Sequence, residues 1–345
     1  MTSIKSLLAE SPYLTSIPAS YIFRNNNIDP NDSALLTEPE LKIPIIDFSL
    51  LTSGDPNQRS KVISELGEAC ENWGFFMVIN HSVPERLIDA VIDGCKGFFD
   101  LAEEEKLEFK GKHVLDPIRY GTSFNASVDK VFYWRDFLKV FVHPQFHFPN
   151  KPSGFSELAL EFCKKIRQVV KGILGGISEG LGLERDYIYK SLNLESGLQV
   201  FAANLYPPCP QPELAMGMPP HSDHGVLTLL IQNGICGLQI QHNGKWVNVN
   251  AIPNSFLVNT CDQLEIFSNG KYKSVVHRAV VNNNATRISL AIANGPSLDT
   301  VVSPASELVE NRPPAYIGLK YKEYLELQQS RNLNGKCMLD CVRLL

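Results

Sequence analysis

The hydrophobic pattern changes its period near residue 195, and this change limits the folds that the chain can adopt. The preceding part mixes short strand-like runs with amphipathic helices, of which the longest is expected over residues 155–181. Beyond it, short strand-like runs are separated by turn residues such as His242-Asn243-Gly244. This spacing is typical of an antiparallel sandwich or barrel. We therefore expect an α+β chain with a mainly β core, a double-sheet jelly roll flanked by helices. The expected strands of this part are residues 198–205, 227–232, 237–241, 245–249, 256–259, 275–281 and 288–293.

Composition and pattern divide the chain into four segments. Residues 1–42 mix Pro, Asn, Asp and Ser and are expected to form an irregular N-terminal arm. Residues 43–195 are expected to be an α/β region with the long helix as a scaffold, followed by the jelly-roll core over residues 196–300. Residues 301–345 are expected to be a C-terminal helical region over the mouth of the barrel. Outside the core, strands are expected at 43–48, 75–79 and 133–142, helices at 59–72, 87–99 and 321–331, and irregular chain at 120–125.

Charge and cysteine usage narrow the classes of partner. The 345 residues are 20% charged with a net charge of −5 and contain no block of one sign, which argues against nucleic acid or an anionic membrane surface as the main partner. A small molecule is the default ligand, and we expect a monomer. The eight cysteines form no C-x-x-C pair, and no apolar leader or membrane-spanning run is present, so free thiols in the reducing cytoplasm are expected.

The tripeptide His221-Ser222-Asp223 is the centre of the functional hypothesis. On an extended chain, residues i and i+2 project to the same side, so an imidazole and a carboxylate converge. His277, at the end of another strand-like run, can supply a second imidazole. Two histidines and one carboxylate on one face form the triad that holds Fe(II) and leaves coordination positions open. The tripeptide alone is a weak signal, because such histidines are more often surface or core residues than ligands.

Further features strengthen that hypothesis. Arg287 and Ser289 share a face of the next strand-like run, and their donors suit the distal carboxylate of a dicarboxylic co-substrate. Tyr206 precedes a proline-stiffened turn and can offer its hydroxyl to the same carboxylate. The segment Gly217–Pro220 places rigid chain directly before His221, as a preorganised metal site requires.

Several motifs together resemble the plant 2-oxoglutarate-dependent dioxygenase family. The similarity runs from about Pro44 to the C-terminal region. It rests on Asn204-Leu205-Tyr206-Pro207-Pro208-Cys209-Pro210, His221-Ser222-Asp223-His224-Gly225, residues 269–278, Arg287-Ile288-Ser289 and the run Trp73–His81. Other stretches are similar to the specialised-metabolism branch that includes salicylate hydroxylases and flavone synthase-like enzymes: Tyr120–Asn125, Trp134-Arg135-Asp136 and Ser330–Leu333.

The resemblance implies a distorted double-stranded β-helix and an oxidoreductase that uses Fe(II), 2-oxoglutarate and O2, with ascorbate as reductant. The implied metal ligands, through which catalysis would run, are His221, Asp223 and His277. Arg287, Ser289, Tyr206 and Asn204 are implied to bind 2-oxoglutarate. The expected reaction is hydroxylation of a phenolic, flavonoid, coumarin or alkaloid, with desaturation, cyclisation and demethylation left open. Residues expected to contact this substrate are Phe124, Phe137, Lys139, Ala202 and Ala293.

Three positions depart from the family pattern: Leu205 replaces a frequent aromatic residue, which bears on the width of the pocket, and Ser82 and Cys261 stand where the family usually has glycine. The last two add a Cβ at a turn and therefore put the local backbone geometry in question. Asp262 and His224 lie near the motif but are expected to be structural. Two other functions stay open: a small-molecule receptor on the same scaffold, and a zinc hydrolase using the same triad, for which the chain offers no evident general base.

Overall fold

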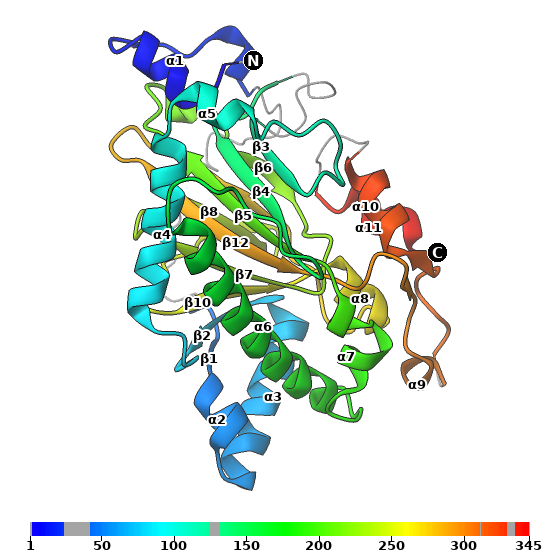
Figure 1. Cartoon of the computed structure of the whole chain (residues 1–345). Helices are drawn as coiled ribbons and strands as arrows, with labels where there is room; N and C mark the ends of the chain where they lie inside the picture. Colours follow the sequence, from blue (N-terminus) through cyan, green and yellow to red (C-terminus); the bar gives the residue numbers. More distant parts are fainter. Residues whose placement is uncertain (1, 24–41, 124–130, 311, 330–334, 345) are drawn as a thin grey trace.

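Two β-sheets face each other across the centre of the molecule (Figure 1). The computed structural model describes residues 2–23, 42–123, 131–310, 312–329 and 335–344. The major sheet has eight strands in the order β1 (Ile45–Asp47), β2 (Phe75–Ile79), β10 (Phe256–Thr260), β7 (Leu227–Gln232), β12 (Arg287–Asn294), β5 (Gln199–Tyr206), β4 (Asp136–His143) and β3 (Ile118–Thr122). The minor sheet has four, in the order β6 (Met218–His221), β11 (His277–Ala279), β8 (Leu238–His242) and β9 (Lys245–Asn248). A short ribbon pairs β13 (Val301–Val302) with β14 (Leu319–Lys320).

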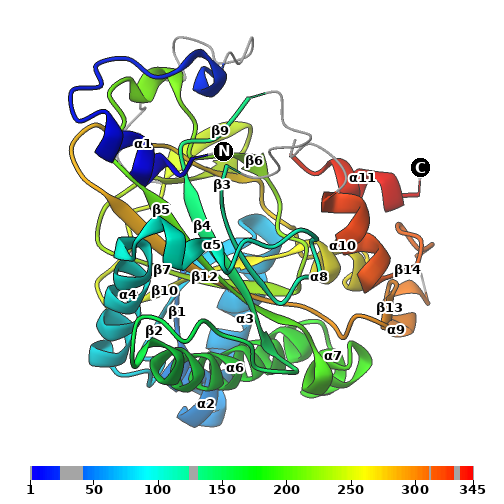
Figure 2. The same cartoon turned by 45° about the horizontal axis from the view of Figure 1, so that its top comes forward.

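Helices cover the outer face of the major sheet and one end of the barrel. The helix α6 buries an apolar stripe that includes Phe162, Ile166 and Ile173, and it packs against α3, α4 and β12 (Figure 1). The C-terminal helices α10 and α11 lie against each other at the side of the barrel (Figure 2). The helices are α1 (Ile4–Glu10), α2 (Phe48–Ser53), α3 (Pro56–Asn72), α4 (Glu85–Asp100), α5 (Glu103–Leu107), α6 (Phe155–Gly180), α7 (Tyr187–Ser191), α8 (Asp262–Phe267), α9 (Ser306–Val309), α10 (Tyr321–Gln329) and α11 (Cys337–Val342).

The sequence pattern predicted this architecture in most of its parts. A mainly β core flanked by helices is confirmed, and the expected strands of the second half agree with β5, β7, β8, β9, β10, β11 and β12 to within a few residues. The expectation of irregular chain at 120–125 was wrong for Tyr120–Thr122, which belong to β3 and pair with β4. The strand β6 was not expected, because it contains Pro219 and Pro220. It lies at the edge of the minor sheet, where proline removes no required ladder bond.

None of the helices in the described ranges is both long and apolar enough to span a membrane.

The division of the chain into four segments at residues 42, 195 and 300 remains a prediction.

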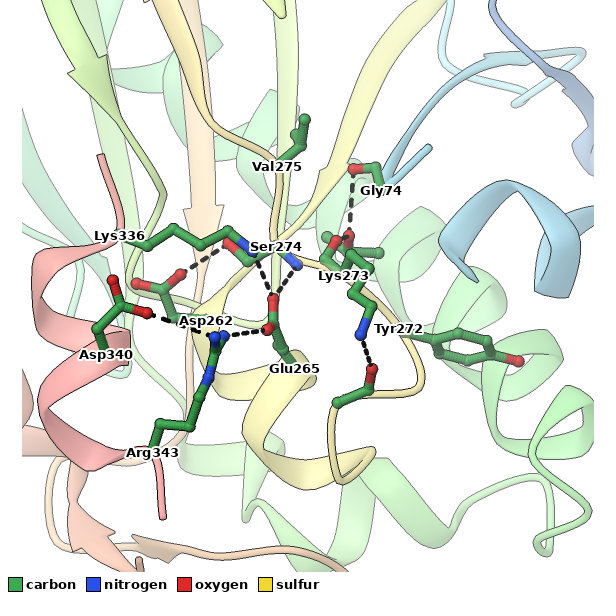
Figure 3. A network of polar contacts seen from close by, with 12 residues as sticks. Gly74, Asp262, Glu265, Tyr272, Lys273, Ser274, Val275, Lys336, Asp340 and Arg343 are labelled. Atoms are coloured by element: carbon green, nitrogen blue, oxygen red, sulfur yellow. Dashed lines mark hydrogen bonds and ion pairs between the residues drawn. The ribbon is translucent and has the colours of Figure 1, made fainter. Parts of the chain in front are cut away.

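A buried carboxylate ties the C-terminal segment to the core (Figure 3). Glu265 of α8 is 1% exposed, and its Oε2 accepts the amide hydrogen of Ser274 at 2.6 Å and pairs with Lys336 at 2.9 Å. Its Oε1 accepts from the Tyr316 hydroxyl at 2.8 Å and from Arg343 at 3.1 Å. A buried carboxylate is tolerated where such donors compensate for lost hydration. This network therefore joins α8, the chain that leads into β11, and α11.

The two departures from glycine differ in backbone conformation. Ser82 has φ of 63°, a left-handed conformation that a residue with a Cβ adopts only at a cost. Cys261, by contrast, has φ of −121° and ψ of 175°, which any residue adopts. The added Cβ therefore strains the backbone at Ser82 and does not strain it at Cys261.

We predict that Glu265→Gln lowers the free energy of unfolding by about 3 kcal/mol, because a neutral amide at this buried position loses the ion pairs with Lys336 and Arg343 and cannot accept from all the donors that reach the carboxylate. Urea denaturation measures the change. The matched control is Glu65→Gln, whose partner Lys61 lies 3.8 Å away in an exposed pair and which should cost at most about 0.5 kcal/mol. Equal losses in the two variants would contradict the structural role of Glu265.

For Ser82→Gly we expect a gain of about 0.5 kcal/mol, since glycine adopts the left-handed conformation freely and this relief exceeds the added entropy of the unfolded chain. Thermal denaturation provides the test. Cys261→Gly is the comparison, and it should destabilise the protein because Cys261 is fully buried without a left-handed backbone. A loss of stability in Ser82→Gly would show that the seryl side chain outweighs the strain.

Candidate metal and co-substrate site

The inner faces of the two sheets enclose a cavity. The major sheet lines it with residues of β2, β3, β4, β5, β7, β10 and β12, and the minor sheet with residues of β6, β8 and β11. Helix α10 contributes Leu325 and Gln328 to the wall. The side chains expected from the sequence to hold a metal and a dicarboxylate all face this space, so one cavity brings together residues that are far apart along the chain.

The three predicted metal ligands meet at one end of this cavity. His221 ends β6 and His277 begins β11, and the two residues are direct partners in the antiparallel pair. The Nε2 atoms of both histidines lie 3.7 Å from Oδ1 of Asp223. One potential ligand atom from each side chain falls within 4.8 Å of the others. This spacing permits a single ion to be bound by all three.

Hydrogen bonds leave the converging atoms free to bind an ion. Nδ1 of His221 lies 2.8 Å from the carbonyl oxygen of Pro219, and Nδ1 of His277 lies 3.2 Å from that of Val275. A carbonyl can only accept, so each Nδ1 carries the proton and each Nε2 presents its lone pair. Oδ2 of Asp223 accepts from the Asn259 amide at 2.9 Å, which leaves Oδ1 available. The donor set fits a divalent ion such as Fe(II).

Electrostatics keep these groups in the protonation states that metal binding requires. Burial and the adjacent His277 lower the pKa of His221 to about 3, so its imidazole is neutral near pH 7. Burial alone would raise the pKa of Asp223, but the two histidines and Asn259 hold it below its usual value. Asp223 is therefore a carboxylate. A neutral His221 imidazole and an ionised Asp223 are the forms that coordinate a cation.

The predicted co-substrate residues form a compact patch on the major sheet. Arg287 is the direct partner of Tyr206 across β12 and β5, and Ser289 is the direct partner of Asn204. The Arg287 side chain lies over the Tyr206 ring at 5.1 Å, and its Nη2 donates to Gln232 at 2.9 Å. Its Nη1 is buried without a hydrogen-bond partner among the described residues. A buried guanidinium with a free donor fits the distal carboxylate of 2-oxoglutarate.

Only some of the residues expected to contact the substrate lie on the cavity wall. Lys139, Ala202 and Ala293 line the cavity. Phe137 is not among the described lining residues, and its ring lies under two cations, 5.0 Å from the Arg135 guanidinium and 5.6 Å from the Lys139 ammonium. Phe124 lies outside the described residues.

Neighbours of the metal ligands have structural contacts. His224 shares a hydrogen bond with the Tyr321 hydroxyl at 2.7 Å, and Asp262 accepts from Ser274 and Tyr324 at 2.7 Å each. Two supporting side chains, Asn259 and Gln232, belong to none of the motifs that carry the metal and co-substrate hypotheses. Each is a polar residue at the end of an apolar strand, β10 and β7 respectively. A polar residue in an otherwise apolar run is the only signal that marks them in the sequence.

Comparison with known proteins agrees with this geometry. Residues 197–296 match the family model of the 2OG-Fe(II) oxygenase superfamily. Residues 43–158 match the model described as the non-haem dioxygenase in morphine synthesis N-terminal domain. Together these matches include β2 to β4 of the first part and the metal and co-substrate residues of the second.

Individual relatives cover nearly the whole chain. A rice (Oryza sativa subsp. japonica) protein, 2-oxoglutarate-dependent dioxygenase 19, is 47% identical, with 89% of this chain and 92% of the relative covered. Thebaine 6-O-demethylase of Papaver somniferum is 37% identical, with 96% and 93% covered. A crystal structure of JOX2 in complex with 2OG, Fe and JA has a TM-score of 0.89 at 30% identity and covers 100% of this chain and 98% of that one. The chain therefore belongs to the 2OG-Fe(II) oxygenase superfamily and is a 2-oxoglutarate-dependent dioxygenase that uses Fe(II) and acts on a small molecule.

Proposed function

We propose that His221, Asp223 and His277 hold the catalytic Fe(II), and that Arg287, Ser289, Tyr206 and Asn204 bind 2-oxoglutarate. The observation that carries this proposal is the convergence of three free ligand atoms within 4.8 Å, each left free by a hydrogen bond on the other side of its group. With both bound, the reaction couples oxidative decarboxylation of 2-oxoglutarate to the oxidation of a substrate C–H bond by O2.

The protein supplies binding and orientation for this chemistry. Pro219 and Val275 fix the imidazole planes, and Asn259 fixes the carboxylate. Arg287, held by Gln232 on one side, keeps Nη1 for the distal carboxylate of 2-oxoglutarate, and the hydroxyl of Ser289 adds a second donor from the same face. Such preorganisation removes most of the entropic cost of bringing the reactants together.

Helix α10 limits access of water beside the triad. Leu325 is 4% exposed and forms part of the cavity wall. Nε2 of Gln328 lies 3.4 Å from the carbonyl oxygen of Ser222, the residue between two of the proposed ligands. An apolar wall at this position favours oxidation of substrate over side reactions with solvent.

We infer that the substrate is a small specialised metabolite that occupies the part of the cavity lined by Lys139, Ala202 and Ala293. The small alanine side chains leave room there for a ring system. We also propose that the protein acts as a monomer in the reducing cytoplasm. Support for this comes from a site built entirely within one chain and from the free thiols of the described cysteines.

Asp223→Ala should abolish Fe(II) binding and 2-oxoglutarate-dependent succinate formation, because two imidazoles alone hold the ion weakly. Asn259→Ala should weaken Fe(II) affinity by about 10- to 100-fold while retaining some turnover, since it removes only the group that orients the carboxylate. Anaerobic metal titration and succinate assays give both values. Asp89→Ala, at an exposed position of α4, is the control and should match the unchanged protein. Full activity of Asp223→Ala would exclude the proposed triad.

A second variant series tests the co-substrate residues. Arg287→Lys should raise KM for 2-oxoglutarate by about 10- to 100-fold, because a lysine loses the forked donor geometry toward the carboxylate. Fe(II) affinity should stay unchanged. Arg278→Lys is the matched control, because Arg278 lines the same cavity from the minor sheet and donates to Gln239 at 2.7 Å. A larger effect from Arg278→Lys than from Arg287→Lys would reverse the assignment.

A further inference from the structure

Two cations face the cavity side by side from the far edge of the major sheet. Arg119 of β3 and Lys139 of β4 are direct partners in the antiparallel pair, and both line the cavity. Lys139 is in turn paired with Ala202 of β5, and Ala202 with Ala291 of β12. Both alanines also line the cavity. Like charges directly opposite each other destabilise a strand pair. An anion bound between Arg119 and Lys139 would reduce this repulsion.

One donor of Arg119, its buried Nε, has no hydrogen-bond partner among the described residues. These residues also offer its guanidinium no ion pair within 4.0 Å. The neighbouring Arg135 is different, because it donates to Asn204 at 3.1 Å and to the carbonyl of Ser123 at 3.2 Å. Buried donors in native proteins are nearly always satisfied, so the unsatisfied Nε of an arginine on a cavity wall points to an acceptor on a ligand.

The position of Arg119 is fixed by its surroundings. An added Cβ at Gly111 would collide with the Arg119 side chain, so the absence of a side chain at Gly111 makes room for the arginine stem. Contact with this backbone restricts the conformations of the arginine. A preorganised cation binds an anion with less loss of entropy than a freely moving one does.

The charge of the cavity stays positive when iron and co-substrate are counted. The described lining contains five cationic side chains, namely Arg119, Arg135, Lys139, Arg278 and Arg287, and a single carboxylate, Asp223. The charges of Fe(II) and of 2-oxoglutarate cancel, so the excess of cations remains. Burial and the neighbouring Arg119 and Arg135 lower the pKa of Lys139 well below its usual value, and an anion bound beside these groups would favour the protonated amine again. Burial also lowers the pKa of Arg119 to about 10.

We propose that Arg119 and Lys139 form an anion subsite that binds a carboxylate of the oxidised substrate, which makes that substrate a small organic acid. The inference rests on the proposed function, because the subsite shares its cavity with the triad and the co-substrate residues. The guanidinium supplies directed donors and the ammonium a compact charge. The small side chains of Ala202 and Ala291, which follow Lys139 across the sheet, leave space beside the subsite for the carbon skeleton of the substrate.

The test compares acids with their neutral counterparts. Benzoate, cinnamate and 2-naphthoate, each paired with its primary amide, are titrated calorimetrically into anaerobic protein loaded with Fe(II) and 2-oxoglutarate. We expect at least one acid to bind about 10-fold or more tightly than its amide, with an affinity that falls as salt is raised. The measurement does not depend on turnover.

Substitutions at and beside Arg119 and Lys139 then test whether these two cations cause the preference for acids over amides. Arg119→Gln and Lys139→Gln should each weaken acid binding about 10-fold and leave amide binding unchanged. Lys139→Arg keeps the charge and should keep most of the preference. Gly111→Ala, which displaces Arg119 without removing it, should also weaken acid binding. In all four variants the affinities for Fe(II) and 2-oxoglutarate should equal those of the unchanged protein, which shows that the site is intact.

Equal binding of acids and amides would overturn the inference, as would variants that weaken both to the same extent. Failure of every acid to bind a protein that still binds Fe(II) and 2-oxoglutarate would also overturn it and would leave the proposed function standing. Failure to bind Fe(II) or 2-oxoglutarate at all would overturn the proposed function, and the subsite with it.

Discussion

The pairing of β6 with β11 is the constraint on which the site depends. It sets His221 directly opposite His277, so two imidazoles from distant parts of the chain share one face of a four-stranded sheet. Bringing two imidazoles and a carboxylate together without an ion has a cost in desolvation and repulsion, visible in the low pKa of His221. The backbone carbonyls that accept from both Nδ1 atoms, and Asn259, hold the three groups in place against that cost.

Polar contacts reinforce the apolar packing around the minor sheet. Strand β11 has three residues, and the chain that leads into it is held by the amide of Ser274 on the Glu265 carboxylate. The same carboxylate binds Lys336 and Arg343, so the C-terminal segment and the approach to His277 share one anchor (Figure 3). Damage to this network would therefore reach the metal site through the backbone of β11, although none of its members contacts the ligand atoms.

Local patterns in the sequence predict the strands and the metal motif, because both depend on neighbours along the chain. The spacing of His221 and Asp223 places them on one side of an extended segment, and the alternation of β12 places Arg287 with Ser289. What lies opposite a residue depends on the register between strands, which no local pattern contains. The pairing of Arg119 with Lys139 and the support of Asp223 by Asn259 are of this kind. The strand at Tyr120–Thr122 was missed for a related reason, since its Gly121 and polar neighbours resemble a turn until β4 pairs with them.

The proposed metal ligands and the proposed anion subsite come from different parts of the chain. The proposed metal and co-substrate residues lie within residues 197–296, the segment that matches the oxygenase family model, whereas Arg119 and Lys139 of the proposed anion subsite lie within residues 43–158. Strands β4 and β5 join these halves near the β3 edge of the major sheet, with Lys139 beside Ala202 in the register. Side chains on β3 and β4 can therefore change without disturbing the hydrogen bonds that hold the triad or the contacts of Arg287. Such a separation would let one reaction be directed to different substrates, because the proposed anion subsite on β3 and β4 lies on other strands than the proposed metal ligands.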